Sequence, residues 1–311
     1  MAVPPLRDVG PATKDAASGR TLLAASATTL TYDASADHVR VIDGQLHEIA
    51  SVRTPAGCAF GDYGGGSLLW YCTAAATATA TGGFSGVVYD VGTRTTAQLP
   101  VAAGPHDALG GSPTWWTIGT HWLGVAYIAN GPQSYAYVNR TTGQVVTYAK
   151  VSADLRANPR ATLDLDRADL AQPLCSPLRA QAPGGSVPTP FAYLRPYGAT
   201  LSHSKAGTRL LVGHCGARRM TVLSRCAKGC GDPAIGDHAV AWLEGAGDLH
   251  PSSAHLRVRL LDRSRTWSWS VTLPRRFSGS DQDPLVAVIG RRAFVLVAGK
   301  LQSVQLPAVK R

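Results

Sequence analysis

The chain has 311 residues, of which 45% are hydrophobic and only 16% are charged. Soluble domains average about 25% charged residues, so neutral polar side chains must solvate this protein, which excludes a coiled coil and a charged disordered tail. The formal net charge is +10, from 30 Lys and Arg against 20 Asp and Glu. These basic residues are scattered, and their diffuse positive field would attract anionic polymers or surfaces. We favour the interpretation that the scattered arginines keep a Gly- and Ala-rich protein soluble, over a dedicated anion site, and we predict no specific nucleic-acid partner.

The N-terminal residues 1–20 are rich in Pro, Ala, Asp and Gly and contain no apolar signal core. We predict that they form a flexible lead, left after an export signal has been removed. No stretch of the chain has the sustained run of about 20 apolar residues that a transmembrane helix requires. The sequence therefore predicts a secreted or extracytoplasmic protein without a transmembrane segment.

The chain contains an even number of cysteines, and some of them are close together: Cys58, Cys72, Cys175, Cys215, Cys226 and Cys230. This pattern predicts disulfides and an oxidising compartment. The segment from Cys58 to Cys72 folds naturally about Gly65, so Cys58 faces Cys72 and Phe60 faces Trp70 on two antiparallel strands.

The other cysteine pairings follow only by elimination, because six cysteines allow fifteen pairings. We pair Cys175 with Cys215, and Cys226 with Cys230. The alternative is a zinc site formed by His214 and three of the cysteines, but their spacing matches no recognised zinc finger. We therefore favour disulfides.

A repeated pattern begins with a hydrophobic residue and Gly, followed by a short turn and a β-rich run. Its copies start at Phe60-Gly61, Ile118-Gly119, Ile235-Gly236 and Ile289-Gly290. The second interval is about twice as long as the other two, which indicates that one copy is degenerate.

A second repeated mark is a β-hairpin with a polar turn. Six such turns are centred near residues 44, 91, 141, 217, 264 and 299. Asp, Asn and Gly suit these turns because they accept the tight backbone geometry. Apolar and polar residues alternate around each turn with the period of a strand. Units of about 40 to 50 residues with several strands each are typical of propeller blades.

In its repeated Ile-Gly turn and its Tyr-Asp-Val-Gly-Thr-Arg hairpin, the sequence over residues 21–311 resembles secreted six-bladed β-propellers of the TolB-like or YVTN-like kind. The resemblance concerns architecture and carries no catalytic residue. We expect an all-β fold: one propeller domain over residues 21–311, with six blades of about four antiparallel strands and an insertion near residues 151–190. Residues 292–306 supply too few strands for a blade, so we expect the N-terminal strand Thr21–Ala27 to complete it and close the ring.

Candidate anion-binding residues are the three pairs of adjacent arginines: Arg218 and Arg219, Arg275 and Arg276, and Arg291 and Arg292. Glycoside hydrolysis needs two carboxyl groups about 5 to 10 Å apart. The chain has only two glutamates, of which Glu244, at the end of a predicted strand, could reach a pore or a loop face.

The densest acidic cluster contains Asp164, Asp166 and Asp169. Calcium prefers six to eight oxygen ligands, but no glycine forms a loop there and Arg167 competes, so we favour a solvated strand edge. Trp267 and Trp269 alternate with serines, and we favour a place in the blade core over a sugar-stacking strip. We predict no metal and no cofactor.

A rigid ring would present its connecting loops, including the insertion, as a recognition surface. We predict a monomeric, secreted, non-catalytic binding scaffold for an anionic cell-envelope polymer or a protein partner. The alternative is a propeller glycoside hydrolase or lyase that uses carboxylates at the pore mouth, Glu244 among them. A third possibility is a structural propeller within a larger assembly.

Overall fold

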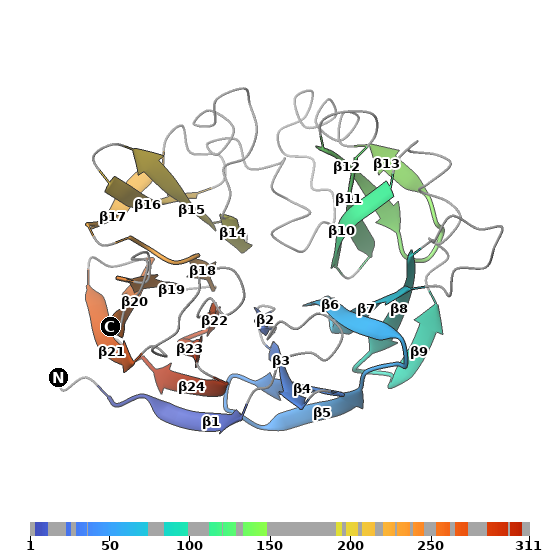
Figure 1. Ribbon diagram of the computed structural model, residues 1–311, viewed down its shortest axis with the longest axis horizontal. Coiled ribbons are helices and arrows are strands. Elements are labelled where there is room, and N and C mark those ends of the chain that lie inside the picture. Colours follow the sequence, from blue (N-terminus) through green and yellow to red (C-terminus); the bar gives the residue numbers. More distant parts are fainter. Residues whose placement is uncertain are drawn as a thin grey trace. The chain divides into compact units, whose positions relative to one another are not determined.

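The computed structural model shows an all-β propeller fold, and every regular element within the described residues is a strand (Figure 1). The described residues are 4–11, 23–25, 29–35, 37–73, 84–98, 112–119, 121–128, 133–147, 191–194, 197–204, 207–214, 220–227, 229–236, 239–245, 253–261, 265–272, 285–297 and 299–306. The predicted insertion near residues 151–190 lies outside them.

The described strands form six four-stranded sheets, five of which consist of consecutive strands. The first contains β2 (Leu23–Ala25), β3 (Thr29–Ser35), β4 (His38–Asp43) and β5 (Glu48–Arg53). The second contains β6 (Cys58–Gly64), β7 (Ser67–Thr73), β8 (Phe84–Asp90) and β9 (Thr95–Gln98). The third contains β10 (Ser112–Ile118), β11 (Trp122–Ile128), β12 (Gln133–Asn139) and β13 (Val145–Thr147).

The fourth sheet contains β14 (Phe191–Leu194), β15 (Tyr197–Ser204), β16 (Gly207–His214) and β17 (Thr221–Cys226). The fifth contains β18 (Ala234–Ile235), β19 (Ala239–Glu244), β20 (Ser253–Leu260) and β21 (Thr266–Thr272). The sixth combines strands from both ends of the chain: β22 (Leu285–Ile289), β23 (Arg292–Val297), β24 (Lys300–Gln305) and β1 (Arg7–Pro11).

The chain divides into two compact units, one formed by residues 1–52 and 175–311 and the other by residues 53–174. The first unit contains the first, fourth, fifth and sixth sheets, and the second unit contains the other two. The predicted propeller class is confirmed. The predicted six-bladed ring and the single domain over residues 21–311 stay predictions, because each unit is described by itself.

All six predicted hairpins are present, as the pairs β4–β5, β8–β9, β12–β13, β16–β17, β20–β21 and β23–β24. Three of their turns are held by the side chain of the residue that ends the first strand. The Oδ1 atom of Asp90 accepts the backbone N–H of Thr93 at 2.7 Å. Asn139 accepts two backbone N–H groups of its turn in the same way. Such local hydrogen bonds explain why the turns could be recognised from composition.

Asp43 and Asp90 are held in ionised form by these turn contacts. Burial raises the pKa of Asp43, but the N–H groups of His47 and Gln45 and the His47 side chain outweigh it, so the pKa lies below its ordinary value. For Asp90 the backbone N–H of Thr93 is the largest cause of a lowered pKa. Both carboxylates are therefore structural parts of the hairpins.

The predicted disulfide between Cys58 and Cys72 is confirmed, with the two Cα atoms 4.0 Å apart. The expected register is also correct, since Phe60 lies opposite Trp70 on β6 and β7. The turn is at Gly65 and Gly66, as expected for a segment that folds about Gly65, and both glycines have positive φ, as a two-residue hairpin turn requires. Phe60 and Gly61, which begin this copy of the repeated pattern, lie inside β6, where the register shifts in a bulge.

The N-terminal segment is not a free lead, because β1 pairs with β24 and completes the sixth sheet (Figure 1). The prediction that residues 1–20 form a flexible lead is thus wrong for residues 7–11. The prediction that Thr21–Ala27 completes the last sheet is also wrong, because β2 within it pairs with β3 instead. The sequence did not reveal β1, since only Leu6 and Val9 contribute apolar contacts there.

The largest core cluster lies between the fifth and sixth sheets and uses alternate residues of each strand. In β21, Trp267 and Trp269 are only 5% and 7% exposed, while Ser268 and Ser270, which alternate with them, face the other side. Their assignment to the core is confirmed, and the sugar-stacking alternative is excluded. The Nε1–H of Trp269 donates to the carbonyl oxygen of Pro4 at 2.6 Å, which joins the core to the N-terminal segment.

Candidate functional site

Glu244 ends β19 and is held by backbone contacts with a short segment beside it. Its backbone forms an antiparallel bridge with Cys230. The N–H of Gly231 donates to the carbonyl of Leu243, and that of Gly245 donates to the carbonyl of Gly229. The predicted Cys226–Cys230 disulfide is present and ties this segment to the end of β17. Glu244 therefore occupies a fixed position at the rim of the fifth sheet.

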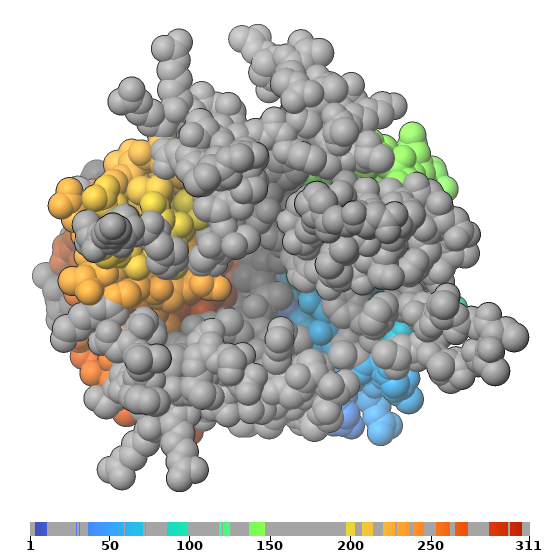
Figure 2. Space-filling model, turned by 45° about the horizontal axis from the view of Figure 1, so that its top comes forward, coloured from blue at the N-terminus to red at the C-terminus, as the bar shows by residue number. Residues whose placement is uncertain are grey.

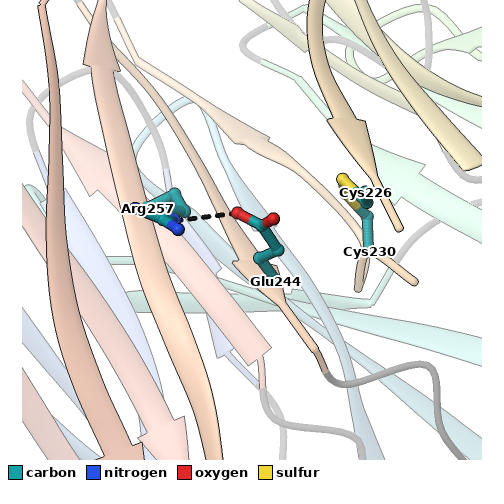
Figure 3. Close-up of a disulfide and its surroundings, with 4 residues drawn as sticks. All are labelled: Cys226, Cys230, Glu244 and Arg257. Carbon is teal, nitrogen blue, oxygen red and sulfur yellow. Dashed lines mark hydrogen bonds and ion pairs between the residues drawn. A yellow bond between two sulfur atoms is a disulfide. The ribbon is translucent and has the colours of Figure 1, made fainter. Parts of the chain in front are cut away.

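The carboxylate of Glu244 faces an arginine (Figure 3). Arg257 of β20 donates from Nε to the Oε2 atom of Glu244 at 2.8 Å. Both side chains are partly exposed, Glu244 by 25% and Arg257 by 32%. A glycoside hydrolase pairs a carboxylate with a second carboxyl group. Here the nearest charged group that the structure shows is a guanidinium, which neutralises Glu244.

Arg292 is half-buried and engaged between two sheets of the first unit. Its Nε donates to the carbonyl of Gly44 at 2.8 Å, and its Nη1 donates to the Oγ of Ser303 at 3.2 Å. Desolvation is the main cause that lowers its pKa, with a contribution from Arg7, while Asp43 opposes the shift. These contacts favour a structural role for Arg292, because they use its guanidinium to join β23 to the β4–β5 turn.

The second unit contains a similar arginine contact, which the sequence analysis missed. Arg140, in the turn after β12, donates from Nη1 to the carbonyl of Gly119 at 2.7 Å. Its Nη2 donates to the Oγ of Ser67 at 2.9 Å, so it joins the second and third sheets. Among these same sheets, the buried Asp62 accepts the backbone N–H of Ile118 at 2.9 Å.

The other candidate arginines are only partly described. Arg291 precedes β23 in its turn and is partly buried. Arg218, Arg219, Arg275 and Arg276 lie outside the described residues, as do Cys175, Cys215 and the aspartates at 164, 166 and 169. Their anion-binding, disulfide and strand-edge assignments stay predictions. Groups of three or more His, Cys, Asp or Glu that could hold a metal ion do not occur among the described residues.

The fourth sheet brings together two arginines that are not adjacent in sequence. Arg209 of β16 lies directly opposite Arg225 of β17, and Ser202 of β15 lies opposite Arg209 on the other side. In the described part of the chain neither arginine side chain has a hydrogen-bond or ion-pair partner. Residues of β15–β17, coloured yellow to light orange, reach the surface on the face that Figure 2 shows. Sequence analysis missed this pair because it considered only consecutive arginines.

Like charges that lie directly opposite on neighbouring strands are destabilising. We therefore expect Arg225→Gln to raise the free energy of unfolding by about 0.5 kcal/mol at low ionic strength, measured by urea denaturation. Added salt should reduce this gain, since Arg225 is exposed. Arg94→Gln removes the same charge from an exposed turn and should leave stability unchanged. A loss of stability in Arg225→Gln would show that the two arginines do not repel one another.

Comparisons with known proteins find similar solved structures but no related sequence. No protein-family model and no curated protein matches the sequence. The AtxE2 isopeptidase is similar in structure, with a TM-score of 0.41 and 8% identity over 99% of this chain and 52% of its own. TolB from Acinetobacter baumannii has a TM-score of 0.37 and 11% identity over 86% of this chain and 54% of its own.

A third similar structure is the β-propeller domain of the Trilobed protease from Pyrococcus furiosus, with a TM-score of 0.35 and 6% identity over 94% of this chain and 79% of that one. The chain spans about half the length of the AtxE2 isopeptidase and TolB chains. Similarity at this level transfers no activity to this protein. In the part of the chain that the structure describes, no helix has the length and apolarity to cross a membrane.

Proposed function

We propose that the protein is an exported, non-catalytic binding scaffold whose partner is an anionic cell-envelope polymer. Two disulfides within the described residues support the exported location, because disulfides persist mainly in oxidising compartments. The excess of 30 basic over 20 acidic residues supports an anionic partner.

One observation carries the proposal: the described carboxylates form hydrogen bonds or ion pairs, whereas the side chains of two opposed arginines form neither. Seven acidic side chains that the structure describes have a polar partner: Asp8, Asp37, Asp43, Glu48, Asp62, Asp90 and Glu244. Asp232 also takes part in an interaction. The side chains of Arg209 and Arg225 have no such partner within the described chain. The acidic groups therefore serve the fold, and uncompensated positive charge is left for a partner.

We expect the full chain to bind fluorescently labelled linear polyphosphate at 50 mM NaCl, measured by fluorescence anisotropy. Binding should weaken at least about tenfold at 300 mM NaCl, because salt shortens the Debye length. Neutral dextran and cationic polylysine are the controls, and neither should bind. Salt-independent binding, or equal binding to dextran, would refute an electrostatic scaffold.

The same preparation tests the hydrolase alternative on a panel of glycans. A scaffold should release no product, and Glu244→Gln should change nothing. Hydrolysis that disappears in Glu244→Gln, in a variant that circular dichroism shows to be folded, would support the hydrolase and contradict the non-catalytic scaffold. The pairing of Glu244 with Arg257 favours the first result.

A further inference from the structure

We propose that Ser202, Arg209 and Arg225 form a binding row for a terminal phosphate group of an anionic polymer. The proposal deepens the proposed function, on which it rests, by naming the site and the chemical group that it binds. The three residues come from three neighbouring strands of the fourth sheet, within one compact unit.

The row lies on one face of its sheet. Successive residues of a strand point to opposite faces. The residue next to each member is buried in one core cluster: Leu201 beside Ser202, Leu210 beside Arg209 and Cys226 beside Arg225. The row itself therefore points away from that cluster. Ser202 and Arg209 are partly buried, and Arg225 is exposed, so a ligand can approach from the side of Arg225.

The spacing of the row suits a small oxyanion. Directly opposed residues on antiparallel strands have Cα atoms about 4.5 to 5.5 Å apart. Two long guanidinium side chains at this separation can converge on one group. A β-bulge between Leu210 and Leu211 shifts the register of β17 and thereby places Arg225, rather than a neighbour, opposite Arg209.

The donors and charges fit phosphate better than carboxylate. A terminal phosphate carries a charge of about −1.5 to −2 near neutral pH and has three acceptor oxygens. The row supplies two positive charges, two guanidinium groups and one hydroxyl. A carboxylate has one charge and two oxygens, and a single bidentate arginine satisfies it. A bound phosphate would also relieve the repulsion between the two arginines.

The test compares Arg209→Gln/Arg225→Gln with Arg94→Gln/Lys300→Gln, which removes the same charge from two exposed residues elsewhere. We expect the row variant to bind labelled linear polyphosphate at least about tenfold more weakly than the unmodified chain, and the control variant about twofold or less. Circular dichroism and thermal unfolding should show that both variants are folded. An equal loss of affinity in the two variants would overturn the proposed binding row, because the net positive charge of the protein would then explain binding.

Two further comparisons test the chemistry. Arg209→Lys/Arg225→Lys keeps the charge but loses the planar donor geometry, so it should recover only part of the affinity. Labelled polyglutamate should bind more weakly than polyphosphate and be less affected by the row substitutions. Equal effects on both polymers would overturn the preference for phosphate.

These outcomes separate the row from the proposed function. Binding of polyphosphate that the row substitutions leave unchanged would disprove the row and keep the anionic scaffold. An unmodified chain that binds neither polymer at low salt would disprove both.

Discussion

Removal of residues 1–11 is expected to lower the free energy of unfolding by about 3 kcal/mol or more, because β1 supplies the outer strand of the sixth sheet. The deletion removes the apolar contacts of Leu6 and Val9 with two core clusters. It also leaves the Nε1–H of the buried Trp269 without its acceptor. Urea unfolding followed by tryptophan fluorescence measures the loss.

Two point variants calibrate this deletion. Trp269→Phe keeps an aromatic ring in the core but removes the donor to Pro4, so it should cost about 1 kcal/mol. Asp8→Ala removes only an exposed contact with Gln302 and should change stability by less than about 0.5 kcal/mol. An unfolding midpoint that the deletion leaves unchanged would show that β1 contributes nothing to the fold in solution.

Exposure of the β24 edge has a second expected effect. An unpaired edge strand presents free N–H and C=O groups that can pair with another chain. The truncated protein should therefore associate at concentrations at which the full chain does not, as measured by light scattering.

Replacement of Cys58 and Cys72 by Ala is expected to cost about 3 kcal/mol in unfolding free energy. The two residues are separated by 14 positions, and a cross-link that closes a loop of this size restricts the unfolded chain by about that amount. Both cysteines are buried, so the smaller side chains also remove core contacts. Urea denaturation under oxidising conditions measures the loss.

The second disulfide serves as the matched control. Cys226 and Cys230 are separated by only 4 positions, and the same loop-entropy relation gives about 2 kcal/mol for their replacement by Ala. A reducing agent should destabilise the unmodified chain. It should leave nearly unaffected a variant in which Cys58, Cys72, Cys226 and Cys230 are all replaced by Ala. A larger loss for the short loop than for the long one would contradict this account.

The proposed phosphate row links stability to function. Repulsion between Arg209 and Arg225 is expected to lower the stability of the free protein, and a bound anion would offset it. The same substitution is thus expected to strengthen the fold and weaken binding. This combination is typical of binding sites, where residues are retained for the partner rather than for the fold.

Part of the candidate site followed from local sequence signals. Glu244 was expected at the end of a strand, and it ends β19. Its partner Arg257 was not expected, because the pairing depends on how β19 and β20 align. The role of Arg292 was also missed, since its acceptor Gly44 is 248 residues away in sequence. Arg209 and Arg225 could have been found by extending the hairpin near residue 217, but only with the bulge included.

The amino-acid sequence by itself determined the class of fold, the hairpins and the Cys58–Cys72 disulfide. Alternating apolar residues, Asx turns, glycines with positive φ and closely spaced cysteines all act over a few residues, so their effects can be read locally. The tertiary structure alone decided the pairing of β1 with β24, the arginines that join neighbouring sheets, and the alignment of Arg209 with Arg225. These features depend on contacts between distant segments and on a register shift, which the packing of the whole sheet selects.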